Sequence, residues 1–174
     1  MERFSEIRPY RDSEVKKVIS RLLEDADFLD TVANFVLPRL ATFFPALLRF
    51  FIKKRLIKQT RAVDTVASMQ AVIADYMEKI VNETTTSLTH SGLERLTIGR
   101  NYLFISNHRD IVMDPAFVNY VLYHGGHDTL QIAIGDNLLK RPFVSDLMRL
   151  NRSFIVKRSA RGRELLSSLQ LLSE

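Results

Sequence analysis

The 174-residue sequence contains no cysteine. Disulfide bonds, thiolate catalysis and zinc or iron–sulfur sites held by cysteine are therefore excluded. No stretch of about 18 apolar residues is free of charge, so no transmembrane helix is predicted. The first residues, 1–14, are too rich in charge for a secretory signal, and none is expected there. The sequence also has no internal repeat, no Gly-rich phosphate loop and no Ser-x-x-Gly nucleophile elbow, which argues against a covalent acyl-enzyme.

What the sequence does contain is enough apolar material for a core and a modest excess of positive charge. Hydrophobic residues make up 46% of the chain, which indicates a folded protein. Lysine and arginine outnumber aspartate and glutamate by 25 to 20, a net charge of +5. This balance favours anionic partners such as phosphorylated metabolites, nucleic acid or lipid headgroups, although a charge of this size is also ordinary.

The N-terminal half reads as helical. Apolar residues recur at helical spacing after Asp12-Ser13-Glu14, which predicts an amphipathic helix. Residues 28–57 are richly apolar, and Pro38 and Pro45 should divide them into two or three helical pieces. A further helix is predicted over residues 61–83, ending at the TTTS run. Residues 1–11 should form an irregular arm.

A dense apolar patch within this half precedes a basic run. The patch comprises Phe43, Phe44, Leu47, Leu48, Phe50, Phe51 and Ile52, and the basic run comprises Lys53, Lys54, Arg55 and Lys58. Apolar bulk beside cationic residues is typical of a helix that lies in a membrane interface. A buried core helix with a solvated basic end would show the same pattern.

Beyond residue 86, short apolar runs alternate with helical segments. Strands are predicted at Tyr102–Ser106, Leu130–Gly135 and Ser153–Lys157, and a strand with a turn at Gly92 over residues 88–96. Helices are predicted at Pro115–Tyr123, Arg141–Leu150 and from Arg161 onward. This alternation predicts an α/β fold: a helical region over residues 1–85, followed by the first βαβ units of a sheet domain over residues 86–174.

The first chemically notable cluster follows the Tyr102–Ser106 run. It contains Asn107, His108 and Asp110, and then Asp114 before Pro115, where Asp would cap a helix and Pro would open it. A histidine at a strand end can act as a general base when a carboxylate orients its ring. Asp114 and Asp110 are both candidates for that carboxylate. Helix capping alone would also explain Asp114, and a solvated turn residue would explain Asp110.

These same residues could also ligate a metal, but no second histidine lies close by, and no metal site is predicted.

A second cluster follows the Ser153–Lys157 run. Lys157 and Arg158 stand at the predicted strand end, where they suit phosphate or carboxylate binding. Arg161 and Arg163 fit a solvated helix face better. Apart from Phe154, aromatic residues are missing from this cluster, which argues against single-stranded nucleic acid as a partner.

The two clusters in this order resemble the glycerolipid acyltransferases, the family that includes lysophosphatidate and glycerol-3-phosphate acyltransferases. The family's first motif is Asn-His-x-x-x-x-Asp, and NHRDIVMDP supplies Asn107, His108 and Asp114 with one extra residue in the gap. The Phe154–Arg158 run resembles its second motif, and Gly135-Asp136-Asn137-Leu138 with Pro142 resembles the glycerol-3-phosphate branch. A later Glu-Gly-x-Arg motif is not in the sequence, so we expect an N-terminal piece of a longer protein.

The resemblance implies transfer of a fatty acyl group from acyl-CoA or acyl carrier protein to a hydroxyl of glycerol 3-phosphate or its 1-acyl derivative, in phospholipid synthesis. His108 would be the base, Asp114 (alternatively Asp110) its orienting carboxylate, and Arg158 with Lys157 the phosphate ligands. No cofactor is implied beyond the acyl donor. The expected partners are that donor, the acceptor and a membrane surface, with the protein cytoplasmic and peripheral on the inner face. A non-catalytic basic membrane-binding module is the alternative.

Overall fold

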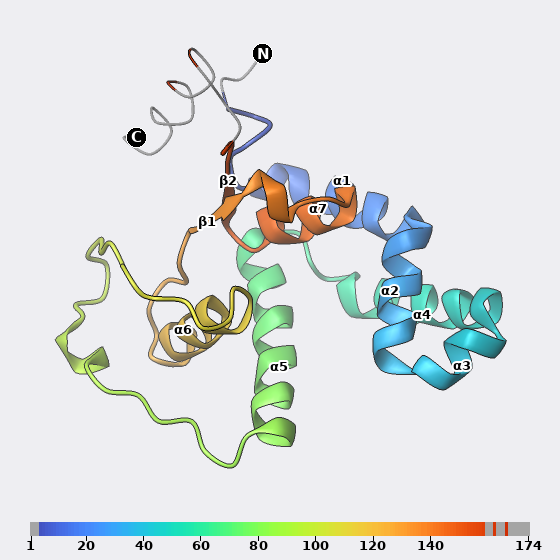
Figure 1. Ribbon diagram of the computed structural model, residues 1–174, viewed down its shortest axis with the longest axis horizontal. Helices are drawn as coiled ribbons and strands as arrows, with labels where there is room; N and C mark the ends of the chain where they lie inside the picture. The colour runs from blue at the N-terminus through green and yellow to red at the C-terminus, as the bar shows by residue number, and fades with distance from the viewer. Residues whose placement is uncertain (1–3, 159–161, 163–165, 167–174) are drawn as a thin grey trace.

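The computed structural model describes residues 4–158, 162 and 166, and it is mostly helical with a small parallel sheet near its C-terminal end (Figure 1). In chain order its α-helices and strands are α1 (Asp12–Glu24), α2 (Ala26–Val36), α3 (Pro38–Phe43), α4 (Pro45–Thr60), α5 (Val66–Thr84), α6 (Met113–His124), β1 (Ile132–Gly135), α7 (Pro142–Leu150) and β2 (Ser153–Val156). Two short 3-10 turns, η1 (Leu93–Arg95) and η2 (Asp136–Leu138), complete these elements. No helix in this part of the chain is long and apolar enough to cross a membrane.

The predicted N-terminal helix is confirmed as α1. Its apolar stripe, Val15, Val18, Ile19 and Leu22, is buried, as the spacing requires. The two prolines divide the next apolar stretch as predicted, because each stands at the first position of a new helix, where its missing N–H costs nothing.

The helix predicted over residues 61–83 begins later, at Val66. Thr65 accepts a hydrogen bond from the backbone N–H of Ser68 (3.1 Å), and the Ser68 hydroxyl accepts one from the N–H of Thr65 (3.0 Å). This reciprocal capping fixes the start of α5.

The sheet consists of two parallel strands. Residues 132–135 of β1 pair in register with residues 153–156 of β2, and α7 connects the two strands. This βαβ unit confirms part of the predicted α/β fold. The helix predicted to begin at Arg161 falls on residues outside the described part of the chain.

Two predicted strands are wrong. Residues 102–106 form no strand, and Leu103 and Ile105 are each 88% exposed. Residues 88–96 hold no strand either, although the turn at Gly92 is confirmed by its φ of +91° and by η1 directly after it. A strand requires a hydrogen-bonded neighbour, and in the described sheet β1 and β2 pair only with each other.

One core joins the helical region to the βαβ unit. Buried side chains of α1 to α5 pack together with Phe143 and Leu150 of α7, and the Phe28 ring lies 5.8 Å from the Phe143 ring. The division into units at residues 85 and 86 stays a prediction.

Polar contacts reinforce this junction. Asp146 on α7 accepts hydrogen bonds from the Tyr10 hydroxyl (2.7 Å) and from Nε and Nη2 of Arg21 (2.7 and 2.6 Å). Burial, followed by the bond to Asp146, raises the pKa of Tyr10, and the same carboxylate raises the pKa of Arg21. The N-terminal arm also runs beside β2 (Figure 1), where the N–H of Ile155 donates to the carbonyl of Ile7 (2.8 Å).

Candidate active site

The turn before α6 holds Asp114 in a fixed position. Its Oδ2 accepts hydrogen bonds from the backbone N–H groups of Arg109 (2.6 Å) and Asp110 (2.9 Å). Asp114 is the second residue of α6 and not its cap, so the predicted capping role is wrong. A carboxylate in the first turn is favourable there because it faces the positive end of the helix dipole.

The same oxygen of Asp114 faces His108. Nδ1 of His108 lies 3.9 Å from Oδ2 of Asp114, and the two side chains are 59% and 30% exposed. This separation exceeds a hydrogen bond, but such contacts are often long before substrate binds. The extra residue in the motif therefore does not carry Asp114 away from His108.

Asp110 instead holds the turn that leads into α6. Its Oδ1 accepts hydrogen bonds from the N–H groups of Val112 and Met113, both at 2.8 Å. These two bonds, that of Met113 first, hold the pKa of Asp110 below its usual value. In the described part of the chain no ion pair or hydrogen bond joins Asp110 to His108. Of the two candidate carboxylates, only Asp114 is placed beside the histidine.

Asn107 is exposed next to His108, and within residues 4–158 its side chain makes no hydrogen bond. Among the residues that the structure describes, no group of three His, Asp or Glu side chains could hold a metal ion.

Side-chain hydrogen bonds connect α6 and α5 to the segment just before β1. Oδ1 of Asn119, buried on α6, accepts a hydrogen bond from the N–H of Leu130 (2.7 Å), just before β1. Nearby, the Gln70 amide of α5 bonds the Thr129 hydroxyl. These contacts fix the helix that follows the His108 turn relative to β1 and α5, and neither was anticipated because both link residues distant in sequence.

The second cluster lies where β1 and β2 end. The N–H of Arg158 donates to Oδ1 of Asp136 (3.2 Å), the residue directly after β1. Lys157 is paired with Glu6 of the N-terminal arm, with Nζ 3.9 Å from Oε2. The predicted strand end thus does present both cations, while Arg161 and Arg163 fall on residues outside the described part.

Gly135 leaves room for the Arg158 side chain. A Cβ at residue 135 would lie 2.7 Å from Nε of Arg158 and 2.5 Å from Oδ1 of Asn137. Since the φ of Gly135 is −68°, this glycine is needed for close approach and not for backbone conformation. The sequence resemblance identified the Gly-Asp-Asn-Leu segment, but it did not indicate that Gly135 lies against the side chain of Arg158.

The two clusters are separate in this structure. Across residues 4–158 no hydrogen bond or ion pair links His108 or Asp114 to Lys157 or Arg158. The segment that leads into α6 runs beside that helix, whereas β1 and β2 lie next to α7 and α1 (Figure 1). A joint site remains a prediction.

The part of the chain that holds both clusters is similar to known proteins. The sequence profile of the Acyltransferase family matches residues 87–174, which include the His108 turn and both strands. The chain belongs to the Acyltransferase family. The chain is also distantly similar to the glycerol-3-phosphate acyltransferase of Xanthomonas campestris, to which it is 29% identical over 112 residues. The match covers 56% of the chain but only 12% of the length of that relative. No solved structure matches the chain.

Proposed function

We propose that the chain is part of a glycerolipid O-acyltransferase. In this proposal it moves a fatty acyl group from acyl-CoA or acyl carrier protein to a hydroxyl of glycerol 3-phosphate or 1-acylglycerol 3-phosphate. The observation that carries the proposal is the placement of His108 against a fixed Asp114, inside the segment that the family profile matches. The relative named a glycerol-3-phosphate acyltransferase supports the class of acceptor.

The proposed chemistry needs one proton carrier. Nε2 of His108, the nitrogen turned away from Asp114, takes the proton of the acceptor hydroxyl. The acceptor oxygen forms a bond to the thioester carbonyl carbon, the carbon–sulfur bond breaks, and the proton passes from His108 to the leaving thiolate. Asp114 stabilises the imidazolium that exists between these steps, because its charge lies beside Nδ1.

Arg158 is the proposed ligand of the acceptor phosphate, with Lys157 in support. A guanidinium offers two parallel donors to phosphate oxygens, and the open space at Gly135 lets this side chain fold back over the end of β1. Binding would bring the acceptor, and with it the two clusters, together.

A membrane surface is the proposed working place, because α2, α3 and α4 expose many apolar side chains. Phe43 is 75% exposed, and Phe44, Leu47, Phe50 and Phe51 are also exposed, whereas Leu48 and Ile52 of the same patch are buried in the core. The cationic Lys54 lies 4.6 Å from the Phe50 ring centre. Apolar rings beside cations suit the headgroup region of an anionic bilayer, and a peripheral position on the inner membrane face is proposed on this basis.

Acyl transfer from labelled acyl-CoA and acyl carrier protein to each acceptor tests the proposal. His108→Ala should abolish transfer while the circular dichroism spectrum stays unchanged. His90→Ala replaces another exposed histidine outside the proposed pair and serves as the matched control. Transfer by His108→Ala at the control rate would refute the proposal, and binding of anionic vesicles without any transfer would favour the non-catalytic module.

A further inference from the structure

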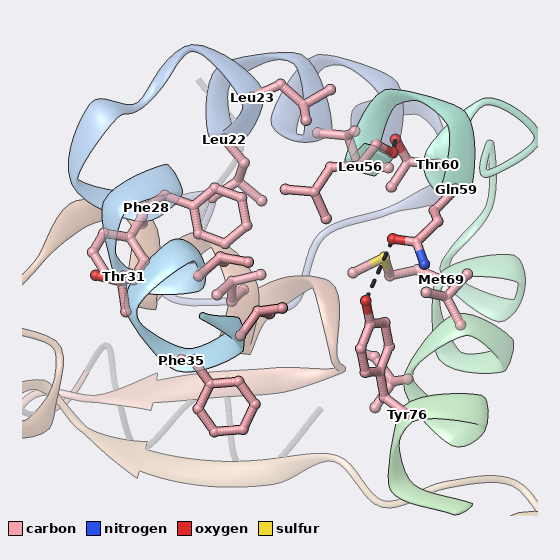
Figure 2. A pocket seen from close by; sticks show the side chains of 17 residues that line it. Leu22, Leu23, Phe28, Thr31, Phe35, Leu56, Gln59, Thr60, Met69 and Tyr76 are labelled. Atoms are coloured by element: carbon pink, nitrogen blue, oxygen red, sulfur yellow. Dashed lines mark hydrogen bonds between the residues drawn. The ribbon is translucent and has the colours of Figure 1, made fainter. Parts of the chain in front are cut away.

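A cavity of about 430 Å³ lies among α1, α2, α4, α5 and α7 (Figure 2). None of the described residues that line it is charged. Its polar groups are confined to Thr31, Gln59, Thr60 and Tyr76, and every other lining residue is apolar. The volume falls within the range of about 300–1,000 Å³ that is usual for small-molecule sites. The lining therefore suits a hydrocarbon group and offers no positive charge to a phosphate or a nucleotide.

The cavity has a closed end and a mouth. Leu22 of α1 and Phe143 of α7 are buried at the closed end, while Phe35 of α2 is 80% exposed. In Figure 2 Phe35 and Tyr76 lie on separate helices, both on the side of the view away from Leu22. The Tyr76 hydroxyl donates to Oε1 of Gln59 (3.3 Å), so a polar bridge between α5 and α4 stands near the exposed side.

The mouth continues into the exposed apolar surface. Phe35 and Val36 end α2, and the exposed residues Leu37 and Leu40 follow directly on the way into α3. On the other side, α4 contributes Leu56 and Gln59 to the lining and carries the exposed cation Arg55 one helical turn before Gln59. An apolar entrance beside positive charge matches a lipid with an anionic head and an apolar chain.

The cavity is not the place where the transferred acyl group would react. Helix α5 contributes Val72 and Tyr76 to the cavity, whereas Ala74 and Met77 face a separate small pocket that they share with Tyr120 of α6. Helix α5 thus stands between the cavity and the His108 turn (Figure 1). An occupant of the cavity would be an additional lipid group.

We propose that this cavity binds one hydrocarbon chain of an anionic membrane lipid, with the head of the lipid left outside near Arg55. The inference rests on the proposed membrane location. Apolar cavities exclude water and accept apolar ligands, so a chain from the bilayer is a better occupant than solvent. One bound chain would tie the helical region to the membrane surface.

A fluorescent fatty acid, 11-(dansylamino)undecanoic acid, tests this directly in solution without vesicles. We expect saturable binding of one probe per chain, with displacement by dodecanoate and by lysophosphatidate. Free CoA and glycerol 3-phosphate have no hydrocarbon chain and should not displace the probe. Displacement of the probe by free CoA or by glycerol 3-phosphate would overturn the proposal. Displacement by acyl-CoA, but by neither dodecanoate nor lysophosphatidate, would also overturn it.

Filling the cavity should remove the site. Val72→Phe should weaken probe binding at least about tenfold, or about 1.4 kcal/mol. Ile80→Phe makes a similar but slightly smaller enlargement on a half-buried residue of α5 that does not line the cavity, and should leave affinity unchanged. Val32→Phe fills the cavity from α2 and provides a second test if Val72→Phe does not fold. Equal affinity in the filled and control variants would contradict the inference.

Two further variants distinguish binding in the cavity from binding to the exposed apolar patch and from the proposed acyl transfer. Phe43→Ser alters the exposed patch and not the cavity lining, so this variant should still bind the probe. Loss of probe binding in this variant would mean that the probe binds the patch instead. His108→Ala should also keep probe binding while transfer is lost. Failure of acyl transfer and failure of chain binding are thereby read in different assays.

Discussion

The assignment of Asp114 as the partner of His108 makes a quantitative prediction. Asp114→Asn replaces the charged oxygens with a neutral amide, whose carbonyl oxygen can still accept the hydrogen bonds from the N–H groups of Arg109 and Asp110. The fold of the turn should persist, and the stabilisation of the imidazolium should be lost. Activity and not stability is therefore the sensitive readout.

The size of the effect follows from the separation of 3.9 Å between Nδ1 of His108 and Oδ2 of Asp114. Two unit charges at this distance attract by about 1 kcal/mol in water and by about 4 kcal/mol at the effective dielectric of a protein surface. The exposed His108 side chain favours the lower value in the free protein, and substrate that excludes water favours the higher. Asp114→Asn should accordingly lower kcat between about fivefold and about a thousandfold.

The matched variant is Asp110→Asn. The amide oxygen of asparagine can accept the same two hydrogen bonds that Asp110 accepts from the N–H groups of Val112 and Met113. We expect kcat to stay within about twofold of the unsubstituted protein. Thiol release from acyl-CoA measures both variants under the same conditions. A larger loss in Asp110→Asn than in Asp114→Asn would refute the assignment.

The structure supports four further predictions. Asp146→Asn should lower the free energy of unfolding by about 1–3 kcal/mol in urea titrations, since it weakens charged hydrogen bonds to Arg21, which is half exposed; an unchanged midpoint would contradict this. Gly135→Ala should raise KM for glycerol 3-phosphate several-fold with a smaller change in kcat, because a Cβ there displaces the Arg158 side chain; an unchanged KM would argue against Arg158 as the phosphate ligand. The pKa of Asp110 lies below its ordinary value of 3.8, so this carboxylate contributes its full stabilisation above pH 3.8 and loses it as the pH falls through the lower pKa of the folded state. Asp110→Asn should therefore make the free energy of unfolding less dependent on pH on the acid side. An unaltered pH dependence would exclude a stabilising role of the ionised Asp110. Phe43→Ser combined with Phe51→Ser should reduce flotation with anionic liposomes, and undiminished flotation would rule out this patch as the membrane face.

Local sequence signals predicted the helices well. The stripe from Val15 to Leu22 and the breaks at Pro38 and Pro45 depend on spacing and backbone restriction within one segment. The start of α5 at Val66 could also have been predicted from the sequence, because Thr65 and Ser68 form a capping pair three residues apart.

Features that depend on distant partners were not predictable in the same way. The apolar run 102–106 has the composition of a strand, but composition cannot supply the neighbouring strand that its backbone needs. The bonds of Asp146 to Tyr10 and Arg21 join residues far apart in the chain. Nothing local to any of these three residues indicated the contact.

The candidate site was predictable in part. The spacing of the motif placed a carboxylate near His108, but it could not choose between two aspartates, since both precede or open the same helix. Backbone N–H groups made the distinction: two of them donate to Asp110 in the turn before α6, and two others hold Asp114 toward the histidine. The role of each carboxylate therefore depends on turn geometry that the sequence alone leaves open.

The most direct test of the central claim is chemical rescue of His108→Gly. If the imidazole of His108 carries the proton in acyl transfer, this variant should lose at least about a hundredfold in rate. Added imidazole should restore part of that rate, with saturation, and should leave the unsubstituted protein unaffected. Transfer by His108→Gly at the unsubstituted rate in the absence of imidazole would contradict the account.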